Sequence, residues 1–136
     1  MSNRRFQIRI GNNSEAIRQI QLRIARVLED LEYSIRDIFR VRLAVEEALL
    51  NAMKHGNHMD PNKSVFIAYT ASTERFRIEI ENDGQGFCDR LVPSPLTISN
   101  LRRPTGRGIM LMRSFMNSIE YNEVGNRLVM EKVRIA

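Results

Sequence analysis

Three short segments of the chain combine residue types that can bind or transfer a phosphate group. The first contains Glu47, Asn51 and His55, which follow one another at four-residue spacing and share one face if the segment is helical. An asparagine oxygen is a neutral ligand that Mg²⁺ accepts, and a glutamate one turn earlier can take a proton from an attacking hydroxyl. Taken alone, the pattern also fits a solvated helix face whose final histidine interacts with the helix dipole.

The second segment follows an alternating run that ends at Glu81. Asn82 and Asp83 come next, and an aspartate at the end of a strand is placed to accept a hydrogen bond, for example from the exocyclic amine of an adenine. Gly84 and Gly86 bracket one residue and permit a tight turn with close backbone approach. A hairpin turn is the alternative, but no second strand follows directly, which favours a ligand-binding turn.

The third segment is Thr105 followed by Gly106, Arg107 and Gly108, just before a predicted helix. Free backbone N–H groups and the positive dipole end at a helix start favour an anion. Four arginines and no acidic residue in the stretch 102–113 further favour phosphate. The segment lacks the Lys-Ser/Thr pair of a P-loop and the leading strand of a dinucleotide fingerprint. An ordinary loop remains the alternative for this segment alone.

The hydrophobic patterns predict the elements that must position these segments. Strands are expected at residues 4–10, 65–69, 76–81, 118–122 and 127–134. Helices are expected after the cap residues 12–14, at 35–55 and from about 108 to 117. This order predicts an α+β fold, a two-layer sandwich with about three helices on one face of a mixed, mostly antiparallel sheet. With no repeat or linker in the sequence, residues 1–136 are expected to form a single domain.

Composition narrows the class of protein further. The chain of 136 residues has a net charge of +5, and 18 of its 21 basic residues are arginine. Arginine suits phosphate and carboxylate, so the excess fits either anionic partners or a solvated surface without a partner. One cysteine, no signal-like segment and no apolar run of membrane-spanning length predict a cytoplasmic protein with no membrane contact. No helix-turn-helix, zinc or aromatic-basic signature points to direct nucleic-acid binding.

In order and spacing, the three segments resemble those of the Bergerat-fold (GHKL-type) ATPases, which include the ATP-binding domains of gyrase, histidine kinases and mismatch-repair proteins. Glu47 and Asn51 look like the N box of that family. Residues 82–86 align with its first glycine box, Asp-x-Gly-x-Gly, and residues 106–108 with the second. The run Asn-Ala-Met-Lys-His-Gly at 51–56 and the sequence at 111–116 look like the anti-sigma factor serine/threonine kinase branch.

The resemblance covers nearly the whole chain and implies binding of ATP and Mg²⁺. It implies phosphoryl transfer to an anti-anti-sigma factor, sequestration of a sigma factor, and pairing of two chains in a homodimer. By position, Asn51 would hold Mg²⁺ and Glu47 would be the general base, with Glu46 as the alternative one residue away. The remaining residues implied to contact the nucleotide are His55, Asn82, Asp83, Gly84, Gly86, Thr105, Gly106, Arg107 and Gly108.

The largest departure from the family is at the adenine-binding position, where Asn82 replaces an aspartate. An asparagine oxygen can still accept a hydrogen bond from adenine, but it carries no charge. A second function also stays open, that of a non-catalytic regulatory module that binds proteins in dependence on adenine nucleotide. Both functions need the same pocket, and only the chemistry of Glu47 separates them. A detached histidine-kinase domain is disfavoured, because the only histidines are His55 and His58 and no phosphoacceptor hairpin precedes them.

Overall fold

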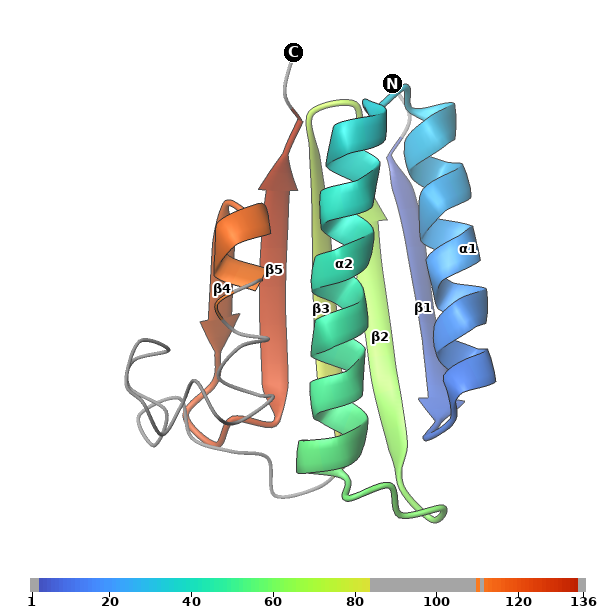
Figure 1. Cartoon of the computed structure of the whole chain (residues 1–136), viewed down its shortest axis with the longest axis vertical. Helices are drawn as coiled ribbons and strands as arrows, with labels where there is room; N and C mark the ends of the chain where they lie inside the picture. The colour runs from blue at the N-terminus through green and yellow to red at the C-terminus, as the bar shows by residue number, and fades with distance from the viewer. Residues whose placement is uncertain (1–2, 84–109, 111, 135–136) are drawn as a thin grey trace.

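The fold is a five-stranded antiparallel sheet with helices on one face (Figure 1). The computed structural model describes residues 3–83, 110 and 112–134. Its elements in chain order are β1 (Arg4–Gly11), α1 (Ser14–Asp30), α2 (Ile35–Asn51), the π-helical turn η1 (Ala52–Gly56), β2 (Ser64–Ala71), β3 (Arg75–Asn82), β4 (Ser118–Tyr121) and β5 (Arg127–Val133). A short helical segment at 112–115 lies on the same face, near β4 and β5. The predicted α+β class is confirmed, and every pairing between the described strands is antiparallel.

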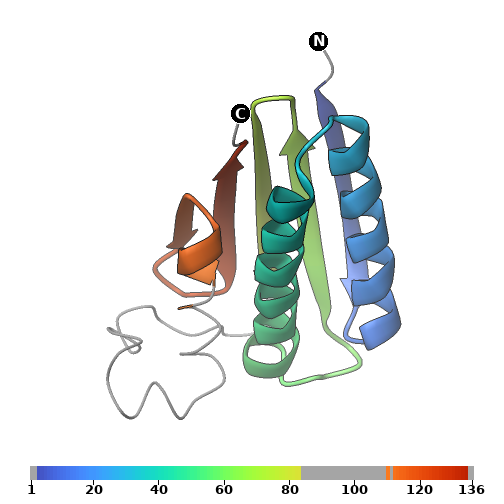
Figure 2. The same cartoon turned by 45° about the horizontal axis from the view of Figure 1, so that its top comes forward.

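Strand order in the sheet is β1-β2-β3-β5-β4, so β3 is central and β1 and β4 are the two edges. In β3, Phe76, Ile78 and Ile80 face the helices and are buried, while the residues between them lie on the open face. This alternation is the period of two that the sequence displays. Figure 2 shows α1 standing over β1 and α2 over the middle of the sheet.

Side-chain caps fix where the two long helices begin. The Asn13 side chain accepts a hydrogen bond of 2.8 Å from the backbone N–H of Ala16, and the Ser34 hydroxyl accepts one of 3.0 Å from Asp37. These bonds satisfy N–H groups that the helices leave without an intrahelical partner. The core lies between the helices and the sheet, and its largest fully buried side chains include Ile24, Leu28, Val41, Leu49, Met53, Ile67, Phe76, Ile78, Met112 and Met130.

The second helix changes its winding before it ends. An uninterrupted helix was expected up to His55, but the α-helix ends at Asn51 and a π-helical turn continues to Gly56. The backbone N–H of Asn57 donates to the Ala52 carbonyl over 2.9 Å, a bond across five residues rather than four. Such wide turns concentrate at functional sites. Here the turn brings the backbone of Gly56 against the end of β3.

Within the described ranges, no helix is long and apolar enough to cross a membrane.

Candidate functional site

Two asparagines that are distant in the sequence line one small cavity beside the end of α2. Asn51 ends α2 and Asn82 ends β3, and both side chains are buried. The other residues around the cavity come from α2, η1, β3 and the β4–β5 hairpin, and they are Ala48, Ala52, Ile80, Tyr121, Gly125, Asn126 and Leu128. The cavity has mainly apolar walls and a volume of about 10 Å³, which is space for about one water molecule and far less than a ligand pocket requires. The structure therefore shows where the two amides meet, in a closed arrangement.

The Asn51 side chain is a buried polar group with one unsatisfied hydrogen-bond donor. It is only 4% exposed, and its Nδ2 atom has no hydrogen-bond partner within the described part of the chain. An unsatisfied buried donor costs about 1–3 kcal/mol, which a polar ligand would recover. An N–H donor does not ligate a cation, so the unpaired Nδ2 atom indicates a hydrogen-bond acceptor as its partner. The role of Asn51 as a Mg²⁺ ligand stays a prediction.

Among residues 3–83, 110 and 112–134, no group of three or more His, Cys, Asp or Glu side chains could hold a metal ion. Magnesium commonly takes one or two ligands from a protein and the rest from substrate phosphates and water. With ATP bound, Asn51 would supply one protein ligand to such an ion, as its motif predicts.

Glu47 lies one helical turn before Asn51 and is partly buried, whereas the adjacent Glu46 is exposed. Burial raises the pKa of the Glu47 carboxyl above its ordinary value, and the charge of Glu46 raises it further, while Lys54 acts in the opposite direction. A carboxylate with a raised pKa holds an accepted proton more strongly and is a better general base. Of the two glutamates left open by the sequence, Glu47 has the surroundings that this role requires.

Asn82 is held between two parts of the chain. Its backbone N–H donates to the carbonyl of Asn126 over 2.8 Å, which joins β3 to the β4–β5 turn. On the other side, a Cβ atom placed on Gly56 would lie 2.7 Å from the Asn82 Oδ1 atom and closer still to the rest of the amide. Only a glycine lets η1 approach this closely. The position of the Asn82 side chain therefore depends on Gly56.

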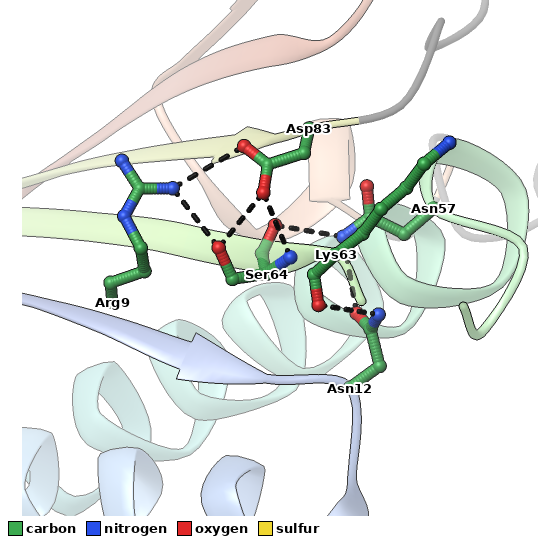
Figure 3. A network of polar contacts seen from close by, with 6 residues as sticks. All are labelled: Arg9, Asn12, Asn57, Lys63, Ser64 and Asp83. Carbon is green, nitrogen blue, oxygen red and sulfur yellow. Dashed lines mark hydrogen bonds and ion pairs between the residues drawn. The ribbon is translucent and has the colours of Figure 1, made fainter. Parts of the chain in front are cut away.

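Asp83 points away from the cavity, because successive side chains of a strand face opposite sides. Its carboxylate accepts hydrogen bonds of 2.9 Å from both the backbone N–H and the hydroxyl of Ser64, and it contacts Arg9 at 3.3 Å (Figure 3). The bonds from Ser64 are the main cause of a lowered Asp83 pKa, and Arg9 contributes to it. Asp83 thus joins the end of β3 to β2 and β1; its contact with nucleotide stays a prediction.

A buried asparagine that the sequence did not single out fixes the loop after η1. Asn57 is fully buried, and its Nδ2 donates to the Asn12 side chain over 3.1 Å and to the Ser64 carbonyl over 2.8 Å. Asn12 in turn donates to the carbonyl of Asp60 and to that of Lys63, the second of which is drawn in Figure 3. Through these bonds the start of α1 and the start of β2 hold the turn that carries Gly56. In the sequence, only a cluster of loop-forming residues indicated this loop, and nothing indicated the role of Asn57.

Comparison with known proteins decides the family. Residues 10–132 match the family model described as the histidine kinase-like ATPase domain. The chain belongs to this family. Sequence relatives place it in the branch that contains the anti-sigma F factors. The anti-sigma F factor of Clostridium perfringens is 30% identical over 115 residues, covering 80% of this chain and 81% of that protein. The one from Oceanobacillus iheyensis is 28% identical over 100 residues, covering 71% and 68%.

A solved structure supports the fold of this histidine kinase-like ATPase domain. The crystal structure of the RsbU and RsbW domains of a Mycobacterium tuberculosis protein superposes with a TM-score of 0.64 at 12% identity. The match covers 96% of this chain but only 32% of that longer one. At this identity the likeness concerns the fold alone, and it agrees with the α+β sandwich.

Several predicted contacts of the ATPase domain lie outside the described residues. These are Gly84, Gly86, Thr105, Gly106, Arg107, Gly108 and the side chain of His55. The structure brings together Asn51 and Asn82 at one cavity, with Glu47 one turn away on α2, and it turns Asp83 to the other side of the sheet.

The Asp83 network gives a prediction for the stability of the domain. Because folding lowers the Asp83 pKa, the ionised carboxylate stabilises the folded chain above the ordinary pKa of 3.8, and this contribution is lost as the pH falls through the lowered value. Asp83→Asn should therefore lower the free energy of unfolding at neutral pH and have a smaller effect in acid. Urea denaturation at several pH values measures this, with the exposed Glu120→Gln as control. An effect of Asp83→Asn that is independent of pH would contradict it.

Proposed function

We propose that this protein is an ATP-dependent serine/threonine kinase that acts as an anti-sigma factor in the cytoplasm. It phosphorylates an anti-anti-sigma partner and sequesters a sigma factor. The observation that carries this proposal is the meeting of Asn51 and Asn82 at one cavity, one helical turn from a partly buried Glu47. The similarity to anti-sigma F factors supports the choice of partners.

In this proposal the adenine of ATP binds beside Asn82, which requires the cavity of about 10 Å³ to open. The Asn82 side-chain oxygen accepts a hydrogen bond from the adenine amine, and the apolar wall formed by Ala48, Ile80 and Leu128 contacts the ring. Asn51 would hold Mg²⁺ through its side-chain oxygen. When bound, the ion neutralises charge on the phosphates of ATP. Because the asparagine at 82 has no charge, adenine recognition here depends on geometry and on the exclusion of water.

Glu47 supplies the proton acceptor for transfer. Its carboxylate takes the proton of the partner's serine or threonine hydroxyl while that oxygen bonds to the terminal phosphorus of ATP. The bond between the terminal phosphorus and the oxygen it shares with the next phosphate breaks, and ADP leaves with that electron pair. The raised pKa of Glu47 favours acceptance of the proton. The alternative, a non-catalytic module dependent on adenine nucleotide, requires the same cavity but no proton transfer by Glu47.

The test is incubation of the full chain with Mg²⁺ and ATP labelled on its terminal phosphate, together with candidate anti-anti-sigma proteins. We expect label on a serine or threonine of the partner. Asn51→Ala should abolish the Mg²⁺-dependent part of ATP binding and with it the transfer. Binding of ATP without transfer to any candidate, together with nucleotide-dependent binding of a protein partner, would favour the non-catalytic alternative. An Asn51→Ala variant with unchanged Mg²⁺ dependence would contradict the ligand assignment.

A further inference from the structure

A groove runs along the outer side of the helix layer, between α1 and α2 (Figure 1). It has a volume of about 470 Å³. Its lining consists of Gln21, Ala25 and Glu29 from α1 and of residues of α2 between Ile35 and Glu46. Over that part of α2 the helix rises by about 16 Å, so the groove has the length of about three helical turns.

The two most exposed large apolar side chains among the described residues both belong to this groove. Ile35 is 88% exposed and Phe39 is 58% exposed, and their spacing of four residues places them on the same side of α2. Ile38 and Leu43 beside them are partly buried. Single exposed apolar side chains are ordinary on a protein surface, but two neighbours that open onto one groove mark a binding surface.

A buried amide at the bottom of the groove has an unused hydrogen-bond acceptor. Gln21 is only 4% exposed, and its Nε2 atom donates to the Arg42 carbonyl over 2.7 Å, which ties α1 to α2. Its Oε1 atom has no hydrogen-bond partner within the part of the chain that the structure describes. A buried acceptor without a partner is unfavourable. A donor group that enters the groove beside Gln21 would remove that cost.

The walls of the groove favour a helix over an extended segment as its occupant. The backbone N–H and C=O groups of α1 and α2 are bonded within each helix, so the groove has no row of free backbone groups with which a strand could pair. An extended segment buried there would lose the hydrogen bonds of its own backbone, whereas a helix satisfies them internally. Apolar residues three and four positions apart on such a helix form a stripe that can pack on Ile35 and Phe39.

The charged residues of the groove specify the polar residues of that helix. Glu29 is next to the end of α1 and lies at the same end of the groove as Ile35, while Glu46 lies at the other end, one turn beyond Arg42. The three charged side chains are exposed, and none forms an ion pair with a residue that the structure describes. Carboxylates at both ends select for lysine or arginine at both ends of the occupant, and Arg42 selects for an acidic residue one turn from one of them.

We propose that the groove between α1 and α2 binds an amphipathic helix of a protein partner, about three turns long, with basic residues at both of its ends. The apolar stripe of this helix packs on Ile35 and Phe39. Its basic ends pair with Glu29 and Glu46, and a donor group on the stripe reaches the Gln21 Oε1 atom.

The groove is separate from the other surfaces of the protein. The residues of α1 beside the β1 edge, which include Leu22 and Arg26, lie on another side of that helix and do not line the groove. Pairing of two chains at that edge would therefore leave the groove open. The groove also shares no lining residue with the cavity at Asn51 and Asn82, so the interaction requires neither nucleotide nor Glu47.

The probe is a labelled peptide of about fourteen residues with a leucine stripe, lysine at both ends and a glutamate one turn from one lysine. A lactam bridge on its polar side keeps it helical, because isolated helices of this length are marginal. Fluorescence anisotropy with the full chain, without nucleotide, should show saturable binding. A peptide of the same composition whose leucines form no stripe should bind at least about tenfold more weakly. Equal binding of the two peptides would overturn helix docking.

Paired substitutions of exposed apolar residues locate the surface. Ile35→Ser with Phe39→Ser should weaken peptide binding about tenfold or more. The control, Met59→Ser with Val124→Ser, removes exposed apolar side chains outside the groove and should stay within about twofold. Equal losses in both pairs would overturn the location. If sedimentation velocity instead shows a dimer that Ile35→Ser with Phe39→Ser dissociates, the groove is an interface between copies and the proposal is wrong.

A charge exchange tests the predicted ends of the partner helix. Glu29→Lys with Glu46→Lys should weaken binding of the lysine-ended peptide by about threefold or more and strengthen binding of a glutamate-ended peptide by a similar factor. The control, Glu120→Lys with Glu123→Lys, makes the same change in net charge at exposed positions outside the groove and should change either affinity by less than about twofold. Failure of the exchanged charges to favour the glutamate-ended peptide would overturn the pairing.

Discussion

Replacement of Glu47 by glutamine is expected to lower the rate of phosphoryl transfer by about 10²–10⁴-fold, the usual contribution of a general base. Glutamine keeps the size of the side chain and an oxygen that can accept a hydrogen bond, but it cannot take the proton of the attacking hydroxyl. The affinity for ATP should change by less than about tenfold, because the base acts on the transition state and not on the bound substrate. Single-turnover transfer of labelled phosphate and a separate ATP titration measure the two effects.

The raised pKa of Glu47 adds a pH signature to this prediction. The base works in its deprotonated form, so the wild-type rate should fall as the pH is lowered toward the Glu47 pKa, and the fall should begin above the pH at which an ordinary glutamate with a pKa of 4.5 would protonate. Glu46→Gln is the control, because Glu46 is exposed on the same turn. A large loss of transfer rate in Glu46→Gln, together with a small loss in Glu47→Gln, would identify Glu46 as the general base.

A loss of stability does not explain the expected loss of phosphoryl transfer in Glu47→Gln. A carboxyl whose pKa is raised by folding is held in its charged form at a cost, so the stability of the chain falls as the pH rises from the ordinary pKa to the raised one. Glu47→Gln removes this cost and should be at least as stable as the wild type at neutral pH. Thermal denaturation of both proteins checks this, and a clearly lower melting temperature would mean that the charged Glu47 has a structural role.

Local periodicity explains why most of the fold could be predicted from the sequence. β3 alternates Phe76, Ile78 and Ile80 with charged residues, and α1 carries its apolar residues at helical spacing behind the Asn13 cap. In each case the apolar residues that become buried lie close together in the sequence, and their spacing determines whether the segment is a strand or a helix. The predicted strands and the first helix therefore match the structure to within a few residues, and Asn51 and Asn82 could be proposed as site residues from their motifs.

The parts that could not be predicted depend on partners far away in the sequence. Asp83 binds Ser64 and Arg9, and Asn57 binds Asn12, so their roles follow from pairings across the sheet edge and not from their own segments. The π-helical turn also has a distant partner, because its Gly56 packs against Asn82 at the end of β3. A sequence pattern of helical period does not distinguish a four-residue from a five-residue hydrogen bond at its end.

The close approach of η1 to β3 gives the second prediction with a large effect. Gly56→Ala should destabilise the fold by about 1–3 kcal/mol, the usual cost of excess volume in a packed interior, and should weaken ATP binding. The added Cβ would collide with the Asn82 amide, so either η1 or the proposed adenine contact must move. Gly56 is not among the residues with a left-handed backbone, so the cost comes from the collision and not from backbone strain. Urea denaturation and ATP titration measure the two losses.

Two further variants separate the collision from other causes. Gly11→Ala makes the same change where the nearest atom to the new Cβ, Asn13 Nδ2, lies at 3.4 Å, and it should alter stability by no more than about 1 kcal/mol. Gly56→Ala combined with Asn82→Ala removes the obstructing amide, so stability should recover relative to Gly56→Ala alone while ATP binding stays weak. This follows because the two residues are in contact and their effects are not additive. A double variant as unstable as the sum of its parts would show that Gly56 is required for another reason, whereas recovery of both properties would exclude Asn82 from nucleotide binding.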